Sequence, residues 1–342
     1  METLWFCLVA VLLAGYVVLD GFDLGAGIVQ LFVAETGQEK SQVLQTIGGV
    51  WSGNEVWLVA AGGTISAVFP ALYASAFSGF YLALMIALWL LILRGVSLEF
   101  RNHSSSPLWQ PFWDTVLAGA SVMLAIFFGV ALGNVVRGVP LDSNGYFFLP
   151  LWTNLLPGNP AGIIDWYTLL AGAVSFLALA FHGSLWVIMK IEGKLQERTR
   201  SFGAKCWAAL FSVTLLISIA SCFIQPNLTR QFQSHPWGVV FPLFALAGLI
   251  GARMLSSRRK DVQAFLASGL YLVGMLTSAA FGVFPKMLPS NPTPDLSLTI
   301  YNASASHHGL VIALCWLIPG MALVTAYSFV VFRHFAGKIE EQ

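Results

Sequence analysis

The chain has 342 residues, of which 57% are hydrophobic and only 10% are charged. Soluble domains carry about 25% charged residues, so this composition cannot cover a water-facing surface and predicts an integral membrane protein. A net charge of +1 with no basic stripe argues against nucleic-acid binding. The four scattered cysteines lack the spacing of a disulfide framework, a zinc site or a c-type haem attachment.

Nine apolar stretches are long enough, or nearly so, to cross about 30 Å of hydrocarbon as helices of about 20 residues. The first has no basic segment before it and no small-residue cleavage site, so we expect a membrane anchor and not a signal peptide. No linker separates a second domain, so we predict one all-α transmembrane domain over residues 1–342. The predicted spans are residues 4–33, 50–72, 75–98, 115–136, 165–188, 204–224, 237–255, 262–284 and 308–333.

The distribution of Lys and Arg predicts the orientation, because these residues accumulate on the cytoplasmic side of a membrane. With the N-terminus outside, fourteen basic residues fall in the inner loops and tail, and only Arg137, Arg230 and Lys286 fall in outer loops. This bias predicts an odd number of spans, a periplasmic N-terminus and a cytoplasmic C-terminus. The longest outer loops, 137–164 and 285–307, are rich in Pro, Asn, Ser and Gly, which indicates ordered turns or caps.

The first span contains the segment Asp20-Gly-Phe-Asp-Leu-Gly-Ala-Gly27. A charge at bilayer depth costs roughly 2.5–3.5 kcal/mol on insertion scales, so acids there usually serve ions, protons or a buried partner. The i, i+3 spacing puts Asp20 and Asp23 on one helix face, and the glycines permit close approach of another backbone or local unwinding. Alternatively, the glycines only pack helices and both acids bond to neighbouring backbone.

The second span begins with the segment Trp51-Ser-Gly-Asn-Glu-Val-Trp57. Glu55 lies one to two turns inside this span, where Ser52 and Asn54 could hold its carboxylate or a chain of waters. A span with these polar groups inserts poorly alone, so we expect other helices to surround it. The alternative is a structural Glu55 that burial keeps neutral.

The third span ends with the segment Arg94-Gly-Val-Ser-Leu-Glu-Phe-Arg101. One interpretation pairs Glu99 with Arg94 or Arg101 at the membrane surface. The other places Glu99, Glu55 and Asp23 at increasing depth. Those three acids would then form a cytoplasm-facing ladder for protons.

Haem held within a membrane needs axial ligands such as His or Met. Five of the six histidines lie in predicted loops, in the tail or at a span boundary, and only His182 lies well within an apolar run. A single intramembrane His is more often a hydrogen-bonded core residue than a ligand. We therefore predict that this chain itself binds no haem.

Six segments resemble, in order, subunit II of the bacterial cytochrome bd-type quinol oxidases, and the match runs from near residue 15 to near residue 330. Each segment alone is weakly specific, but six in sequence are highly specific. They are Asp20-Gly-Phe-Asp-Leu-Gly-Ala-Gly27, Trp51-Ser-Gly-Asn-Glu-Val-Trp57, Tyr73-Ala-Ser-Ala-Phe-Ser-Gly-Phe-Tyr81, Gly129-Val-Ala-Leu-Gly-Asn-Val-Val-Arg-Gly-Val-Pro140, Phe284-Pro-Lys-Met-Leu-Pro-Ser290 and Leu296-Ser-Leu-Thr-Ile-Tyr301.

The resemblance implies a nine-helix, multi-pass subunit of the bacterial cytoplasmic (inner) membrane. The family's enzyme oxidises quinol, reduces dioxygen to water with protons from the cytoplasm, and so generates a proton gradient. Two b-type haems and one d-type haem are held by subunit I, which is the implied partner together with membrane lipids and quinone. In some members subunit II binds a structural quinone. The quinone type and any small single-span accessory subunits are left open.

The resemblance also matches individual residues of this chain to positions in the family's motifs. Asp23 matches the second Asp of the family's first motif, Glu99 the acid near the loop end of the third span, and Trp57 an aromatic residue near the oxygen entrance of some members. Several members have Asp directly after the first Trp of the second motif, where this chain has Ser52. Glu55 follows three residues later, about 4.5 Å along and 300° around a helix, and we hypothesise that it replaces the missing acid.

Two other classes of function share parts of this pattern. A proton-coupled secondary transporter would also carry intramembrane acids and glycine-broken helices, but with a clearer pair of repeats around a midplane site. A scaffold with no transport role would tolerate neutralisation of Asp23, Glu55 and Glu99 together. Co-purification with a haem-rich partner separates an oxidase subunit from a transporter, which would be isolated alone and colourless.

Overall fold

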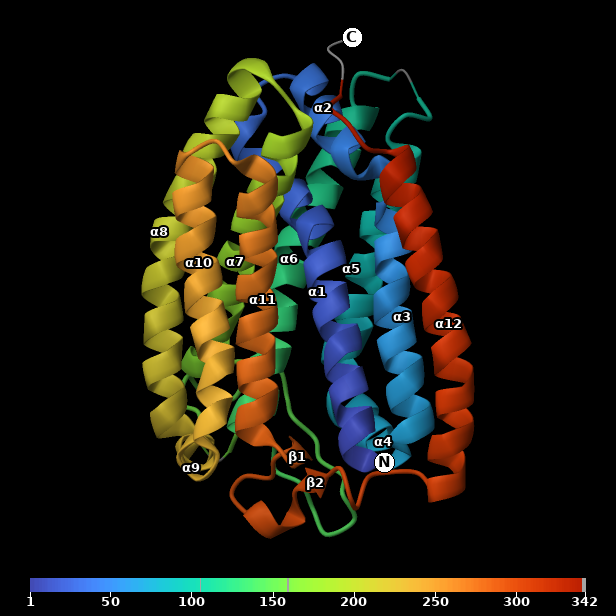
Figure 1. Ribbon diagram of the computed structural model, residues 1–342, viewed down its shortest axis with the longest axis vertical. Helices are drawn as coiled ribbons and strands as arrows, with labels where there is room; N and C mark the ends of the chain where they lie inside the picture. Colours follow the sequence, from blue (N-terminus) through green and yellow to red (C-terminus); the bar gives the residue numbers. More distant parts are fainter. Residues whose placement is uncertain (105, 159, 340–342) are drawn as a thin grey trace.

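In the computed structural model the long helices run side by side along one axis, and loops and short elements close both ends of the bundle (Figure 1). The structure describes residues 1–104, 106–158 and 160–339. The N-terminus lies at one end of the bundle and the C-terminal segment at the other (Figure 1). Termini at opposite ends agree with an odd number of crossings.

Twelve α-helices, two 3₁₀ segments and one short antiparallel strand pair make up the regular structure of the described residues. The first six helices are α1 (Glu2–Val33), α2 (Gly37–Gly48), α3 (Trp51–Val68), α4 (Pro70–Gly79), α5 (Tyr81–Phe100) and α6 (Trp109–Arg137). The others are α7 (Trp166–Lys190), α8 (Gly193–Ile224), α9 (Pro226–Ser234), η1 (Pro236–Val239), α10 (Val240–Ser257), α11 (Asp261–Val283), β1 (Lys286–Leu288), η2 (Pro294–Leu296), β2 (Leu298–Thr299) and α12 (His307–His334).

The predicted all-helical membrane class is confirmed. Among the described residues, eight helices are long and apolar enough to cross a membrane, and α3 together with α4 forms a ninth candidate. The largest shift of a boundary is in α8, which begins at Gly193 and not at residue 204. Its first turns are rich in Lys, Glu, Gln and Arg, which are good helix formers but carry no hydropathy signal, so the apolar run underestimates the helix.

The second and third predicted spans need correction, because the chain bends between them. α3 ends at Val68, and α4 begins at Pro70 with a bend of 118°. Pro70 has no backbone N–H and its ring would clash with the preceding turn, so the helix breaks at Phe69. Residues 75–79, predicted to open the third span, therefore belong to α4, and α5 begins at Tyr81.

Helix α1 is central to the packing and contacts α3, α6, α7 and α11. Its closest approach is to α7, where a Cβ added to Gly25 would lie 2.7 Å from the Cα of Gly183. α1 remains one continuous helix through its glycines. Of the two roles that the sequence left open for these glycines, the structure supports close packing and not local unwinding.

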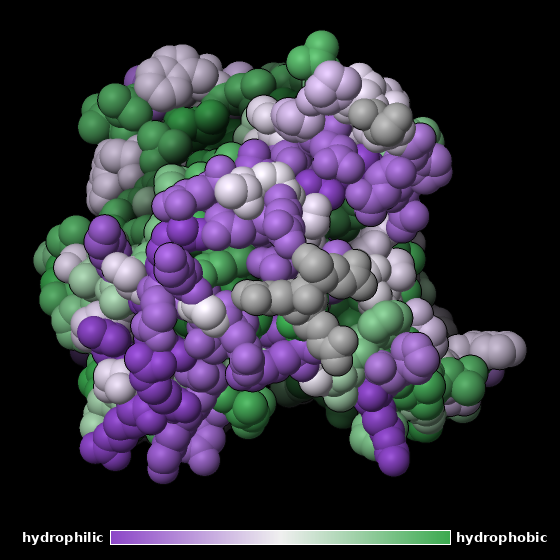
Figure 2. Space-filling model, turned by 90° about the horizontal axis from the view of Figure 1, so that it is seen from above, coloured by the Kyte–Doolittle hydropathy of each residue, from purple (hydrophilic) through white to green (hydrophobic). Residues whose placement is uncertain are grey.

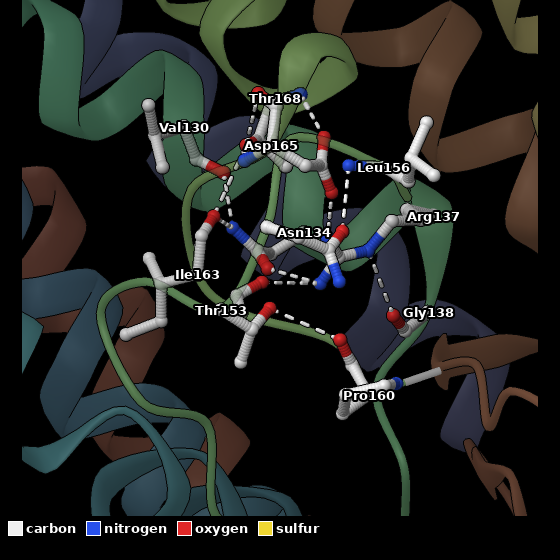
Figure 3. A network of polar contacts seen from close by, with 12 residues as sticks. Val130, Asn134, Arg137, Gly138, Thr153, Leu156, Pro160, Ile163, Asp165 and Thr168 are labelled. Atoms are coloured by element: carbon white, nitrogen blue, oxygen red, sulfur yellow. Dashed lines mark hydrogen bonds and ion pairs between the residues drawn. The ribbon is translucent and has the colours of Figure 1, made fainter. Parts of the chain in front are cut away.

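A buried ionic network joins α6 to α7 at the end of the bundle near the N-terminus (Figure 3). Arg137, in the last turn of α6, pairs with Asp165, whose side chain also accepts from the Thr168 N–H and so caps α7. Arg137 further donates to Asn134 Oδ1 at 2.7 Å and to the Gly162 carbonyl at 3.1 Å. Arg137, which the sequence count placed in an outer loop, is therefore a buried residue of α6.

The two long loops at this same end fold over the bundle as a cap. Backbone hydrogen bonds join them, from Val139 N–H to the Pro289 carbonyl and from Asn291 N–H to the Val139 carbonyl. Phe147 and Ile300 are buried beneath this cap. The described parts of both loops are therefore ordered and packed against the bundle, as expected for caps.

The opposite end of the bundle carries α2 and most of the basic residues. Arg101 binds Asp114 of α6, with 2.5 Å between Nε and Oδ1, and donates to Ser41 Oγ of α2 at 2.9 Å. Figure 2 looks onto this end and shows hydrophilic residues gathered over it, with apolar residues toward the periphery. The two ends of the molecule therefore differ in charge, as the sequence predicted.

The contact between Gly25 and Gly183 leads to a first prediction. Gly25→Val should separate α1 from α7 and destabilise the folded protein by at least about 1–3 kcal/mol, because overpacking forces backbones apart. The measurement is the thermal unfolding midpoint of the protein in detergent. Gly119→Ala in α6 is the control, since a Cβ there meets nothing within 4 Å. Equal midpoints for both variants would contradict the assigned role.

Candidate functional site

Two acids of α1 form the centre of a polar site between α1, α3 and α5. Asp20 and Asp23 are almost completely inaccessible, at 0% and 1% exposure. They lie on the same face of the helix, as the i, i+3 spacing predicted. Both acids bind side chains of other helices, so the alternative in which they only bond to neighbouring backbone is not what the structure shows.

Asp20 is held by the guanidinium of Arg94 from α5. Arg94 Nη1 donates to Asp20 Oδ2 at 2.7 Å, and Arg94 Nη2 donates to Asp20 Oδ1. This two-point geometry is the strongest form of an Arg–carboxylate pair. Since Arg94 is only 1% exposed, it neutralises Asp20 inside the bundle.

Asp23 is held more weakly than Asp20. Asn54 of α3 donates through Nδ2 to Asp23 Oδ2 at 2.7 Å, and Arg94 Nη2 lies 3.9 Å from that same oxygen. The other oxygen, Oδ1, is buried and has no hydrogen-bond partner among the described groups. Two carboxylates therefore face one guanidinium, and a proton on Asp23 makes the group electrically neutral.

Glu55 lies half-buried on α3, next to Asn54 in the sequence. It interacts electrostatically with Arg94 and Asp20, so the structure brings the first and second candidate motifs together. Ser52 is exposed one turn earlier, in a different environment from Glu55. Trp57 is half-buried, and its ring lies against Gly15 of α1.

Glu99 is not brought into this site. It is exposed near the end of α5, and both arginines proposed as its partners bind other acids: Arg94 binds Asp20, and Arg101 binds Asp114. The predicted pairing of Glu99 with either arginine is therefore wrong. Arg94 and Glu99 are five residues apart, which turns them about 140° from each other on a helix, so they cannot share a face.

His182 is a hydrogen-bonded core residue. Its Nε2 donates to the Val18 carbonyl at 3.0 Å, its Nδ1 lies 2.7 Å from Ser268 Oγ, and its ring stacks on Phe265. With both ring nitrogens engaged and no exposed surface, His182 does not fit an axial haem ligand. Among the described residues, no group of three or more His, Cys, Asp or Glu could hold a metal ion.

Sequence reasoning missed two parts of the site. Tyr16 is buried on the same face of α1 as Asp20, one turn earlier, and interacts electrostatically with Asp20, Arg94 and Glu55. Within the part of the chain that the structure describes, several buried polar atoms of α1, α3 and α5 have no hydrogen-bond partner. Such atoms are typical of internal sites that take up water. They include Tyr16 Oη, Asp23 Oδ1, Trp57 Nε1 and Arg94 Nε. The i, i+4 spacing of Tyr16 and Asp20 was the available signal.

Comparison with known proteins gives a consistent family match. The family model described as cytochrome bd terminal oxidase subunit II matches residues 1–335. The chain is 30% identical to the cytochrome bd-I ubiquinol oxidase subunit 2 of Escherichia coli, over 96% of this chain and 93% of that protein. It is also 30% identical to the cytochrome bd ubiquinol oxidase subunit 2 of Bacillus subtilis, over 97% and 96%.

Two further similarities extend this match. The chain is 29% identical to a probable cytochrome oxidase subunit 2 of Haemophilus influenzae, over 99% of this chain and 95% of that protein. The solved structure of the bd oxidase from Geobacillus thermodenitrificans contains a chain with the same fold, with a TM-score of 0.77 over 98% of both chains. The sequence identity to that chain is 17%, so this likeness concerns the fold alone.

The buried pair of Arg94 and Asp20 leads to a second prediction. Arg94→Met should destabilise the protein by about 3–5 kcal/mol, because it leaves buried carboxylates without a cation. Asp20→Asn should cost less, since Asp23 remains 3.9 Å from the guanidinium. Thermal unfolding in detergent measures both effects.

The matched control for this prediction is Arg198→Gln. Arg198 is partly exposed and pairs with Glu35 and Glu39 at the surface. Such exposed pairs contribute about 0–1 kcal/mol. An Arg94→Met variant as stable as Arg198→Gln would show that the buried pair does not hold the bundle together.

Proposed function

The chain belongs to the family of cytochrome bd terminal oxidase subunit II, and we propose that it acts as this subunit in a membrane-bound quinol oxidase. Such an enzyme oxidises quinol and reduces dioxygen to water in aerobic respiration. Similarity over nearly the full length of both chains supports this function. The family match favours an oxidase subunit over a secondary transporter.

We further propose a location in the bacterial cytoplasmic membrane, with α2 and the C-terminal segment on the cytoplasmic side. The support is the excess of Lys and Arg at that end, which remains when the buried Arg94 and Arg137 are left out. The N-terminus and the cap of long loops would then be periplasmic.

The proposed role of the acid site is to pass protons from the cytoplasm toward the place of oxygen reduction. The observation that carries this proposal is the free, buried Oδ1 of Asp23 beside a carboxylate already neutralised by Arg94. Asp23 can take up and release a proton while the Asp20–Arg94 pair stays intact. Asp20 thus holds the cation in place, and Asp23 is the better candidate for the proton carrier.

Glu55 is the proposed neighbour of Asp23 in this route, because it is half-buried and interacts with Arg94 and Asp20. Ser52, which is exposed, is not assigned a role in proton transfer. Glu99 is proposed only as an outer acid near the cytoplasmic surface. Trp57, half-buried between α1 and α3, stays a candidate for the oxygen entrance by the family resemblance.

We propose that the haems, two of b type and one of d type, are held by a partner subunit. His182 is the one buried histidine of the six, and its ring nitrogens already have partners, so this chain offers no free intramembrane His for a haem. The other five histidines are exposed. Quinol oxidation and oxygen reduction therefore belong to the partner, and this chain supplies a proton route to it.

The proposed docking face for this partner is formed by α3 and α12. α12 is the least buried of the candidate spans, because only 6% of its most apolar 18-residue stretch is buried inside the molecule. A groove of about 530 Å³ between the two helices is lined by both small and large apolar residues, and its small residues include Gly63, Gly309 and Gly320. Small residues let another helix approach closely, as a docked transmembrane partner requires.

The third prediction concerns the acids themselves. Asp23→Asn should lower oxygen consumption by the intact complex at least about tenfold, because a carrier that cannot ionise blocks proton delivery. Glu55→Gln should have a smaller effect in the same direction, and Glu99→Gln the smallest, since bulk water can replace an exposed acid. Oxygen uptake with a quinol substrate measures all three.

Asp295→Asn serves as the control, because Asp295 is an exposed acid in the loop cap. Its oxygen uptake should match that of the unaltered complex. If a chain that carries both Asp23→Asn and Glu55→Gln keeps its oxygen uptake and proton uptake unchanged, the proton route does not pass through these two acids.

The fourth prediction concerns the haems. The chain should co-purify with a haem-rich partner, and His182→Gln should leave the haem content of the complex unchanged, because Gln can keep hydrogen bonds to Val18 and Ser268. Pyridine haemochrome spectra measure the haem content per complex. Loss of one haem in this variant, with the complex otherwise assembled, would show that His182 is a ligand after all.

A further inference from the structure

A stripe of five positions on one face of α1 runs from the acid site toward the end that carries α2. The positions are Tyr16, Asp20, Asp23, Gly27 and Gln30, spaced by four, three, four and three residues. This spacing keeps them on one side of a helix. Gly27 and Gln30 therefore continue the face of Asp23 toward the basic end of the bundle.

Helix α6 faces the part of this stripe nearest α2, at Gly27 and Gln30, and adds polar groups to it. Ser121 lies directly opposite Gly27, where an added Cβ would lie 2.9 Å from the Ser121 Cβ. Gln30 donates through Nε2 to the Asp114 carbonyl at 3.4 Å. Ser121 and Gln30 are almost completely inaccessible, at 0% and 1% exposure.

These buried groups keep free hydrogen-bonding atoms. Gln30 Oε1, Ser121 Oγ and Asp23 Oδ1 have no partner among the described groups. Serines inside helices commonly bond to the carbonyl four residues earlier, and Ser97 and Ser184 of this chain do so. Ser121 does not, although it is as deeply buried, so its hydroxyl is left for another partner.

The stripe reaches a charged cluster at the cytoplasmic end. Asp114 binds Arg101 and lies 4.0 Å from Lys40, whose side chain is 32% exposed. Gln30 is bonded to the backbone of that same Asp114. The cluster of Lys40, Arg101 and Asp114 thus connects the solvent with the first buried member of the stripe.

We propose that the interface of α1 and α6 holds a water-filled proton path, from the Lys40–Arg101–Asp114 cluster through Gln30 and Ser121 to Asp23. This inference rests on the proposed function and deepens it by naming the inlet. It differs from the ladder of Glu99, Glu55 and Asp23, whose outer member lies exposed and away from the site.

The geometry suits a chain of a few waters. Asp23 and Gln30 are separated by two helical turns, about 10 Å, and Ser121 lies between them. Hydrogen bonds of about 2.8 Å would bridge these gaps with roughly one or two waters each. Gln30 orients water without changing its own protonation, and Ser121 accepts one proton as it gives another. Each passage delivers one proton to the Asp23 carboxylate, without electron transfer.

The test uses the intact complex in lipid vesicles with the variants Gln30→Leu, Ser121→Ala and their combination. The double variant should lower turnover about tenfold. It should also raise the solvent isotope effect, the ratio of turnover in H₂O to turnover in D₂O, because proton delivery becomes rate-limiting. Gln30→Glu, which keeps an oxygen at the same place, should restore most of the rate. A purely packing role for these residues would leave the D₂O effect unchanged.

The matched control is Ser184→Ala, which removes an equally buried helical hydroxyl outside the stripe. It should keep both turnover and the D₂O effect. If Asp23→Asn is slow while the Gln30 and Ser121 variants behave like Ser184→Ala, the path is wrong and the proposed function stands. If Asp23→Asn is itself as fast as the unaltered complex, the proposed function fails first.

Discussion

The bundle depends on neutralising charge at positions buried between its helices. Arg94 and Asp20 achieve this with two parallel hydrogen bonds at a buried position. α5 packs mainly against α6, and the long Arg94 side chain is what reaches from α5 to α1. Because a lone buried charge costs several kcal/mol, this one contact fixes α5 relative to α1. It leaves Asp23 farther from the guanidinium, at 3.9 Å from Arg94 Nη2.

The two sides of α1 have different roles, because one packs closely against α7 and the other carries buried polar groups. On one side, Gly25 lets the backbone of α7 approach almost to contact, and Phe22 stacks on Trp186. On the other side lie Asp23 and Gln30, each with one side-chain oxygen that has no hydrogen-bond partner among the residues described. Close packing of the first side holds the second in register with α3 and α6, so polar groups can remain incompletely bonded without opening the bundle.

Much of this arrangement could be predicted from the sequence, because hydropathy marks spans and helical spacing marks faces. The shared face of Asp20 and Asp23 and the helical bundle followed from such local patterns. The pairing of Arg94 with Asp20 could not be predicted in this way, because the two residues are 74 positions apart in the chain. Glu99, much nearer in the sequence, was the competing partner for Arg94. The break at Phe69 was missed because the apolar signal continues through Pro70, although the chain turns there.

The separation between Asp20 and Arg94 has a consequence for how the protein is made. A ribosome delivers the acids of α1 to the insertion machinery well before the guanidinium of α5 has been synthesised. Until then the first helix carries its carboxylates either protonated or in contact with water. Asp20 can reach its ion pair only after α5 has been made, so the final packing of α1 follows the synthesis of this N-terminal third.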